Sequence, residues 1–405
     1  MIIGLAEMKN YKIRWLILTA GFLSNMCQGL AYASSVFMAP IIASFGIEKA
    51  QASLAFSLVV GCLPIGTIAG GIISGKKGPR LPIVLGSVIF ALGLIIASFA
   101  VRAGSLALLY TGFGVMLGVG SGMAYGSIVG VVAQWFPDMR GFATGLVVAA
   151  LGGGPLILAP FGQWLLNRYE LQGTYMVLGV LFAIIMICAA LVVRQSEETA
   201  GGKAAQGAGK DFTAGEMLKT ASFWMIAFMY AAGAFAGLMI VSQAKGITLD
   251  VINSVNVSAS DPEMLAVMGV MILAVANALG RLVWGAVSDK LGRMPALIIM
   301  FALNCLVMAF MTLISQSFAG FMAALVLVGL LFGGYLGLFP SVCADFFGSK
   351  NITLNYGILF VAFAVAGVAG PMTGACLEPA SAYYTAAALS LLGLVVTIIV
   401  SKVRR

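Results

Sequence analysis

Long apolar stretches recur along the whole chain, and short polar segments separate them. Each stretch has about 20 or more residues, the length that an α-helix needs to cross a bilayer core of about 30 Å. The pattern predicts twelve such helices, at residues 14–40, 51–74, 81–101, 105–133, 141–166, 172–193, 221–246, 263–288, 294–315, 317–343, 353–377 and 382–401. We therefore expect an all-α membrane protein with twelve transmembrane helices.

Composition supports a membrane protein and argues against an enzyme. Of the 405 residues, 61% are hydrophobic and 9% are charged, whereas a soluble domain carries about 25% charged residues. The chain has no histidine, which excludes imidazole general bases, Ser-His dyads and histidine metal sites. No pair of carboxylates falls inside the predicted helices, so we expect no catalytic residue, no metal and no cofactor.

Basic residues concentrate in alternate loops. When both termini are placed in the cytoplasm, most of the 22 Lys and Arg residues lie on that side, as the positive-inside rule requires. The outer side then holds only Lys49, Arg102, Arg168 and Lys245. The net charge of +8 follows from this topology and gives no reason to expect a nucleic acid as partner. Because no cleavage site follows the first apolar stretch, we expect no removable signal peptide.

A polar segment at 194–220 divides the chain into two parts. Its first portion is rich in Gly, Ala and charged residues, as in a flexible linker, and its last portion is a short amphipathic stretch. We expect an N-terminal six-helix half at 1–194, a cytoplasmic linker at 195–220 and a C-terminal six-helix half at 221–405. Two halves related by a parallel repeat are typical of secondary transporters that bind substrate at the midplane.

A short loop motif supports the repeat. "GIISGKKGPR" (71–80) and "GAVSDKLGRM" (285–294) share Gly, Ser, Lys and Gly in register. The motif residues are Gly71, Lys76, Gly78 and Arg80 in the first copy, and Gly285, Asp289, Lys290, Gly292 and Arg293 in the second. The second copy resembles the cytoplasmic loop signature of the major facilitator superfamily, whereas the first has Gly75 where this family usually has an acid.

Two further segments narrow the resemblance. "WFPDMRGFATG" (135–145), which contains Arg140, resembles a pattern of the monocarboxylate porters, and "DFTAGEMLKTASFW" (211–224) is similar to the segment before helix seven in bacterial oxalate/formate antiporters. The resemblance implies the fold of the superfamily, a gating role for the loop motif and Arg140, and a place in the bacterial inner (plasma) membrane. We expect a monomer, surrounded by membrane lipid, that works by alternating access.

One arginine lies at membrane depth. Arg281 interrupts the apolar run "VANALGRLVWGAVSDKLGR" (275–293), and all acids fall in loops or at the ends of the predicted helices. A buried cation of this kind should face a cavity or a partner. We expect a substrate carboxylate to pair with its guanidinium. The alternative is that Arg281 reaches the cytoplasmic face or ties carbonyl groups of neighbouring helices. A single asymmetric cation favours a carrier over a channel, which normally has a ring of like groups.

The depth of residues along the predicted helices suggests further substrate-binding residues beside Arg281. Tyr125, Tyr230 and Tyr335 lie at a similar level, and Asn277 is one turn away on the same helix face. Tyr32 is nearer the outer end. We expect these residues to contact the substrate, although for the tyrosines hydrogen bonding between helices is equally compatible with the sequence.

The number of buried cations bears on the substrate. Relatives that exchange oxalate carry a second cation in helix eleven, and the resemblance of "NYGILFVAF" (355–363) to that segment puts Phe363 at the position. One cation matches one carboxylate, so we expect a small monocarboxylate such as L-lactate, pyruvate or formate, with Phe363 at its apolar end. Resemblance to monocarboxylate porters implies proton symport, with Asp345 as the nearest candidate for the proton. Transfer of the proton on the substrate acid, and anion exchange, remain open.

Overall fold

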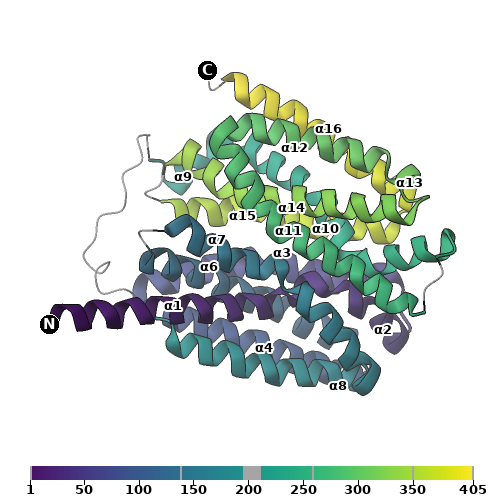
Figure 1. Ribbon diagram of the computed structural model, residues 1–405, viewed down its shortest axis with the longest axis horizontal. Helices are drawn as coiled ribbons and strands as arrows, with labels where there is room; N and C mark the ends of the chain where they lie inside the picture. Colours follow the sequence, from purple (N-terminus) through teal and green to yellow (C-terminus); the bar gives the residue numbers. More distant parts are fainter. Residues whose placement is uncertain (1, 137–138, 195–210, 258–259, 349–350, 404–405) are drawn as a thin grey trace.

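The chain forms a bundle of long helices (Figure 1). The computed structural model describes residues 2–136, 139–194, 211–257, 260–348 and 351–403, and these contain no strand. The elements before the linker are α1 (Ile2–Gln28), the 3₁₀ helix η1 (Gly29–Ala33), α2 (Ser35–Phe45), α3 (Lys49–Lys77), α4 (Arg80–Ala103), α5 (Leu106–Leu109), the π-helix η2 (Tyr110–Met116), α6 (Leu117–Trp135), α7 (Arg140–Gly153) and α8 (Pro155–Val192). Those after it are α9 (Ala214–Leu218), α10 (Ala221–Ser254), α11 (Pro262–Leu291), α12 (Arg293–Ala309), α13 (Met311–Ile314), α14 (Phe318–Phe347), α15 (Ile352–Cys376) and α16 (Pro379–Val403).

The helices are long and apolar enough to cross a membrane. Within the described residues, ten stretches meet this condition, and one of them, Phe142–Val192, has 51 residues. A straight helix of that length would measure about 76 Å, more than twice a bilayer core. It is bent at Glu170, where φ is 53° and ψ is −172°, so it supplies the predicted fifth and sixth helices. With the shorter α12, every predicted stretch has a helix, and the expected all-α membrane protein is confirmed.

Several helix bounds differ from the prediction. α10 continues to Ser254, whereas hydropathy placed its end at 246, because hydropathy marks where the chain leaves the apolar layer and not where helical hydrogen bonding stops. Lys245 therefore lies well inside α10 and not at its outer end. The first predicted helix is interrupted by η1, and the fifth is interrupted where α7 ends at Gly153 and Pro155 begins α8.

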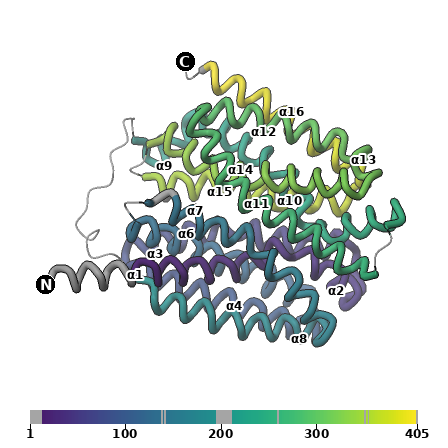
Figure 2. Tube along the Cα trace, viewed as in Figure 1, coloured from purple at the N-terminus to yellow at the C-terminus, as the bar shows by residue number. Residues whose placement is uncertain are grey.

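Helices pair in the same way within each part of the chain. α3 packs on α6 and α4 on α8, just as α11 packs on α14 and α12 on α16. Contacts between the two parts run from α3 to α15 and from α11 to α7 and α8; Figure 2 shows the earlier helices below the later ones. This pairing fits two six-helix halves. Their boundaries stay a prediction, since residues 195–210 of the linker lie outside the described part.

Both chain ends lie at one end of the bundle, at the left in Figure 1, which we call the inner end; the opposite end is the outer end. The two loop motifs lie at the inner end and have the same backbone conformation. α3 stops at Gly78 (φ 79°, ψ 165°) and α11 at Gly292 (φ 91°, ψ 155°). Each glycine N–H bonds the carbonyl of the motif serine, Ser74 or Ser288, at 3.0 and 2.9 Å. The side chains of Lys76, Arg80 and Lys290 are exposed there.

Candidate functional site

Arg281 lies in the buried interior, on α11. This helix begins where the Asp261 carboxylate accepts the Met264 N–H (2.9 Å) and Pro262 fills the first position. Arg281 is 6% exposed, and its neighbour on the same face, Asn277, is 1% exposed. In the described residues, no carboxylate lies within ion-pair distance of its guanidinium.

The guanidinium contacts the facing helix α7. Nη1 donates to the Val148 carbonyl at 2.7 Å, and Nε donates to Oδ1 of Asn277 at 3.4 Å. Nη2 is buried and has no hydrogen-bond partner among the described residues. Of the guanidinium nitrogens, only Nη1 bonds a carbonyl group of a neighbouring helix, which was the alternative role for Arg281. A buried donor without a partner costs about 1–3 kcal/mol, so the guanidinium is incompletely satisfied.

Close approach of α7 to the guanidinium depends on the segment "GGGP" (152–155). A Cβ at position 152 would lie 2.8 Å from Nη2 and 3.1 Å from Cζ of Arg281. Only a residue without a side chain leaves room for the cation at this point. Gly152, the first glycine of this segment, therefore forms one wall of the arginine site.

Three tyrosines on other helices are near enough to Arg281 to interact with it. Tyr32 of η1, Tyr125 of α6 and Tyr356 of α15 each interact electrostatically with Arg281. The Tyr356 hydroxyl also lies 3.1 Å from that of Tyr230 on α10. Tyr32, Tyr125 and Tyr230 are therefore brought together with Arg281, as the sequence suggested. Tyr356 was not predicted, although it lies two turns before Phe363 on the same helix.

Aromatic rings form an apolar wall beside these hydroxyls. Phe363 is fully buried, and its ring centroid is 4.9 Å from that of Phe360, 5.8 Å from Tyr230 and 6.3 Å from Phe332. Phe332 in turn meets the ring of Tyr32 edge to face at 6.0 Å. The wall joins α15, α10, α14 and η1, and one predicted residue, Phe363, is at its centre.

Tyr335 has different surroundings from the other predicted tyrosines. It is fully buried on α14, its ring centroid is 5.1 Å from that of Phe301 on α12, and its face covers Gly233 of α10. Its hydroxyl has no hydrogen-bond partner among the described residues. Its level along the helix is as predicted, but its ring packs against α12, which carries none of the other site residues.

Asp345 lies at the inner end, with the loop motif and not with Arg281. Its carboxylate is 4.0 Å from Nε of Arg293, whose Nη1 also lies 2.7 Å from Asp289 and donates to Ser288. The side chain of Asp345 is 40% exposed. Arg140 begins α7 at the same end, but its side chain lies outside the described residues.

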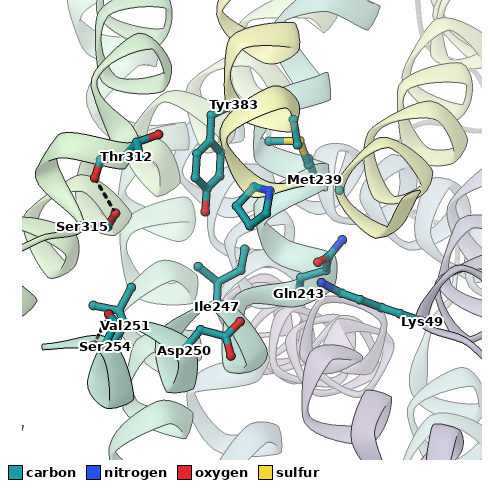
Figure 3. A pocket seen from close by; sticks show the side chains of 13 residues that line it. Lys49, Met239, Gln243, Ile247, Asp250, Val251, Ser254, Thr312, Ser315 and Tyr383 are labelled. Atoms are coloured by element: carbon teal, nitrogen blue, oxygen red, sulfur yellow. Dashed lines mark hydrogen bonds between the residues drawn. The ribbon is translucent and has the colours of Figure 1, made fainter. Parts of the chain in front are cut away.

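One cavity lies beside the arginine site, and another lies near the outer end. Next to Asn277, on the outer side of Arg281, a space of about 10 Å³ is bounded by Tyr32, Gly152 and Val241, which is room for about one water. A separate cavity of about 210 Å³ opens near the outer end. Figure 3 shows Tyr383, Asp250 and Lys49 around it. Lys49 and Asp250 both line this cavity, so a cation and an acid share it.

Comparison with known proteins identifies the family. The Major Facilitator Superfamily profile matches residues 21–371 and 246–405. The oxalate:formate antiporter of Oxalobacter formigenes is 30% identical over 375 residues, 92% of this chain and 87% of the relative. Monocarboxylate transporter 12 of Xenopus laevis is 25% identical over 400 residues, 93% and 85% of the two chains. Monocarboxylate transporter 13 of Rattus norvegicus is 30% identical over 191 residues, 46% and 44%.

These matches confirm the resemblance drawn from the loop motif and from the segments at 135–145 and 211–224. The relatives are transporters and not enzymes. The all-α bundle and the extent of the profile match agree with each other. The chain belongs to the Major Facilitator Superfamily and is a membrane transporter related to the oxalate:formate antiporter and the monocarboxylate transporters.

Proposed function

We propose that this transporter moves small monocarboxylates, L-lactate, pyruvate or a similar anion, by alternating access, with Arg281 pairing the substrate carboxylate. In this proposal the inner end faces the cytoplasm of a bacterial plasma membrane, as the positive-inside pattern favours. The protein works as a monomer and couples transport to protons.

The observation that carries the proposal is the unsatisfied guanidinium of Arg281. A buried cation needs a counterion or a full set of acceptors. Within the described residues, Arg281 has no paired acid, and its Nη2 makes no hydrogen bond of good geometry, although the Tyr32 side chain interacts with the guanidinium. A carboxylate supplies two oxygens in the plane of the guanidinium, which suits both terminal nitrogens at once. Substrate binding would then replace the Val148 carbonyl on Nη1.

The groups around Arg281 suit a short carboxylic acid with a polar α-substituent. Hydroxyls of Tyr32, Tyr125 and Tyr356 lie within electrostatic reach of the guanidinium and can bond the hydroxyl of lactate or the keto oxygen of pyruvate. The aromatic wall around Phe363 fits the apolar end of such an acid. Because the space beside Asn277 holds about one water, α7 and α8 must separate from α10 and α11 to admit the anion from the outer end.

Proton symport is the coupling that we propose. Asp345 at the inner end is the candidate proton carrier, because its carboxylate is partly exposed and pairs with Arg293. Protonation would weaken that pair, which joins α12 and α14 beside the loop motif at the inner end. The other route is protonation of the substrate itself while it is bound to Arg281.

Anion exchange is a second candidate function. The relative that is 30% identical over 92% of this chain is an oxalate:formate antiporter, which favours exchange. In such a carrier, Arg281 would need an anion to balance its charge whenever the helices reorient.

The two candidates differ in one experiment. Labelled L-lactate uptake is measured in liposomes that contain the purified protein, with an alkaline interior and no anion inside. Accumulation driven by the pH gradient supports proton symport. Uptake that appears only after preloading with formate, oxalate or lactate would exclude symport and support exchange. If neither condition gives saturable uptake of L-lactate, this substrate assignment is wrong.

A further inference from the structure

A second buried cation lies far from Arg281, toward the outer end of the bundle. Lys245 of α10 is 7% exposed, and its ammonium is held by two groups. Nζ donates to Oε1 of Gln163 on α8 at 2.8 Å and lies 2.5 Å from Oε2 of Glu263 on α11. Glu263 and Arg281 are both on α11, and their separation in sequence corresponds to about 27 Å along the helix axis.

This lysine joins the two parts of the chain at the outer end. Gln163 precedes the linker, whereas Lys245 and Glu263 follow it. The amide of Gln163 is fixed, because its Nε2 donates to Oδ1 of Asn167 at 2.8 Å and its Oε1 is thereby directed at the lysine. The outer ends of α8 and α10 cannot separate without breaking the bond between Lys245 and Gln163.

The ion pair is asymmetric in its access to water. The side chain of Lys245 is 9% exposed, whereas that of Glu263 is 55% exposed. Glu263 can therefore leave the ammonium and be solvated at little cost. Lys245 would remain buried, where an unpaired charge is unfavourable, so another anion would bind to it. The group that best replaces a carboxylate on an ammonium is another carboxylate. An ammonium also donates three hydrogen bonds, and the described residues supply two partners.

We propose that Lys245 is a second carboxylate-binding site, at the outer end, where an arriving substrate anion takes the place of Glu263 and releases Gln163. This inference rests on the proposed function, since the anion is then passed to Arg281. Binding at Lys245 opens the outer contact between α8 and α10, and this opening gives access to the small space beside Asn277. The site selects for a negative charge before the substrate reaches the tyrosines.

Kinetics measured from each side of the membrane test the site. In cells that express the protein, Lys245→Met should raise KM for entry of L-lactate about ten-fold, equivalent to about 1.4 kcal/mol. KM for exit should change less than about two-fold, because an anion from the inner end reaches Arg281 first. Lys245→Arg should restore most of the affinity. Glu263→Gln removes the competing carboxylate and should lower KM for entry.

Lys49→Met is the matched control, because it removes the same charge from the outer end at an exposed lysine that takes no part in the contact with Gln163 and Glu263. It should leave KM for entry within about two-fold of the unsubstituted protein. If Lys49→Met and Lys245→Met raise KM equally, the effect is general electrostatic attraction and the site is excluded. A higher KM in Glu263→Gln would also overturn the proposal, since the ion pair would then aid binding.

A distance measurement separates this inference from the proposed function. Spin labels are placed on Tyr169→Cys and Met264→Cys, two exposed outer positions, in a chain whose native cysteines are replaced. Addition of L-lactate should lengthen the distance between the labels, whereas sodium chloride at equal ionic strength should leave it unchanged. The Gln163→Leu variant should show the longer distance without any added anion. An unchanged label distance in Gln163→Leu would show that the bond between Lys245 and Gln163 does not hold the outer ends together, even if L-lactate is transported. A longer label distance without transport of L-lactate would contradict the substrate assignment in the proposed function but not the role of Lys245.

Discussion

Gly152 of α7 lies directly against the guanidinium of Arg281 on α11, so close that a Cβ at position 152 would be 2.8 Å from Nη2. The two helices belong to different parts of the chain. A glycine of one part and a cation of the other therefore form a single site, and movement of the parts relative to each other changes the surroundings of the cation.

Replacing Gly152 tests this contact. Gly152→Ala should raise the apparent KM for L-lactate on the order of ten-fold, because the new methyl group displaces the guanidinium from its position by a few tenths of an ångström or more. Folding should be retained, since the nearest atom is the end of a flexible side chain. The measurement is concentration-dependent uptake into proteoliposomes.

The neighbouring glycine provides the control. A Cβ at position 153 would meet Cβ of Ala278 at 3.5 Å, an ordinary contact. Gly153→Ala should therefore leave KM near that of the unsubstituted protein. Equal values of KM for the two variants would show that the contact with Arg281 has no influence on binding.

Tyr356 should contribute to selection of hydroxy acids. Tyr356→Phe removes a hydroxyl that lies 3.1 Å from the Tyr230 hydroxyl and interacts with Arg281. Loss of one neutral hydrogen bond, about 1 kcal/mol, should lower the preference for L-lactate over propionate about five-fold. The ratio of the two inhibition constants against labelled pyruvate uptake gives this preference.

Tyr335→Phe is the matched substitution on α14. The Tyr335 hydroxyl is buried without a hydrogen-bond partner in the described residues, so its removal should leave selectivity unchanged and preserve or raise the thermal unfolding midpoint. A loss of lactate preference in Tyr335→Phe but not in Tyr356→Phe would reverse the assignment and return Tyr335 to the site.

The loop motif at the inner end should depend on Gly292. With φ at 91° and ψ at 155°, its backbone occupies a region that residues with a side chain avoid. Gly292→Ala should lower the free energy of unfolding by about 1–3 kcal/mol, visible as a lower thermal midpoint in detergent. Gly285→Ala in the same helix, where a Cβ meets nothing within 4 Å, should not lower it. Similar midpoints in both variants would refute the backbone argument.

The fold was largely predictable because each membrane-spanning helix needs a long run of apolar residues, which is visible in the sequence. The limits of hydropathy appear at the outer end of α10, which was predicted at residue 246 although the helix continues to Ser254. The interruption of the first predicted helix by η1 was also not predicted, since residues 29–33 remain apolar and buried. Apolar character alone does not distinguish an α-helix from a 3₁₀ turn.

For the site residues, counting along the helices predicts a level but not the direction of a side chain. Counting along the helices placed Tyr230 and Tyr335 near the level of Arg281, but helix rotation decides which neighbour a ring meets, and Tyr335 meets Phe301. Tyr356 was missed because it lies in the first turns of α15. Its spacing from Phe363, two helical turns, was a usable signal that both side chains share one face.

The most direct test of the account is uptake of labelled L-lactate by the Arg281→Gln variant, measured as a function of concentration beside the unsubstituted protein. We predict that kcat/KM falls about 30-fold or more, as expected when a buried charge pair loses one partner, with a thermal unfolding midpoint that shows a folded protein. Transport of L-lactate by Arg281→Gln with unchanged apparent KM would contradict the claim that Arg281 binds the substrate carboxylate.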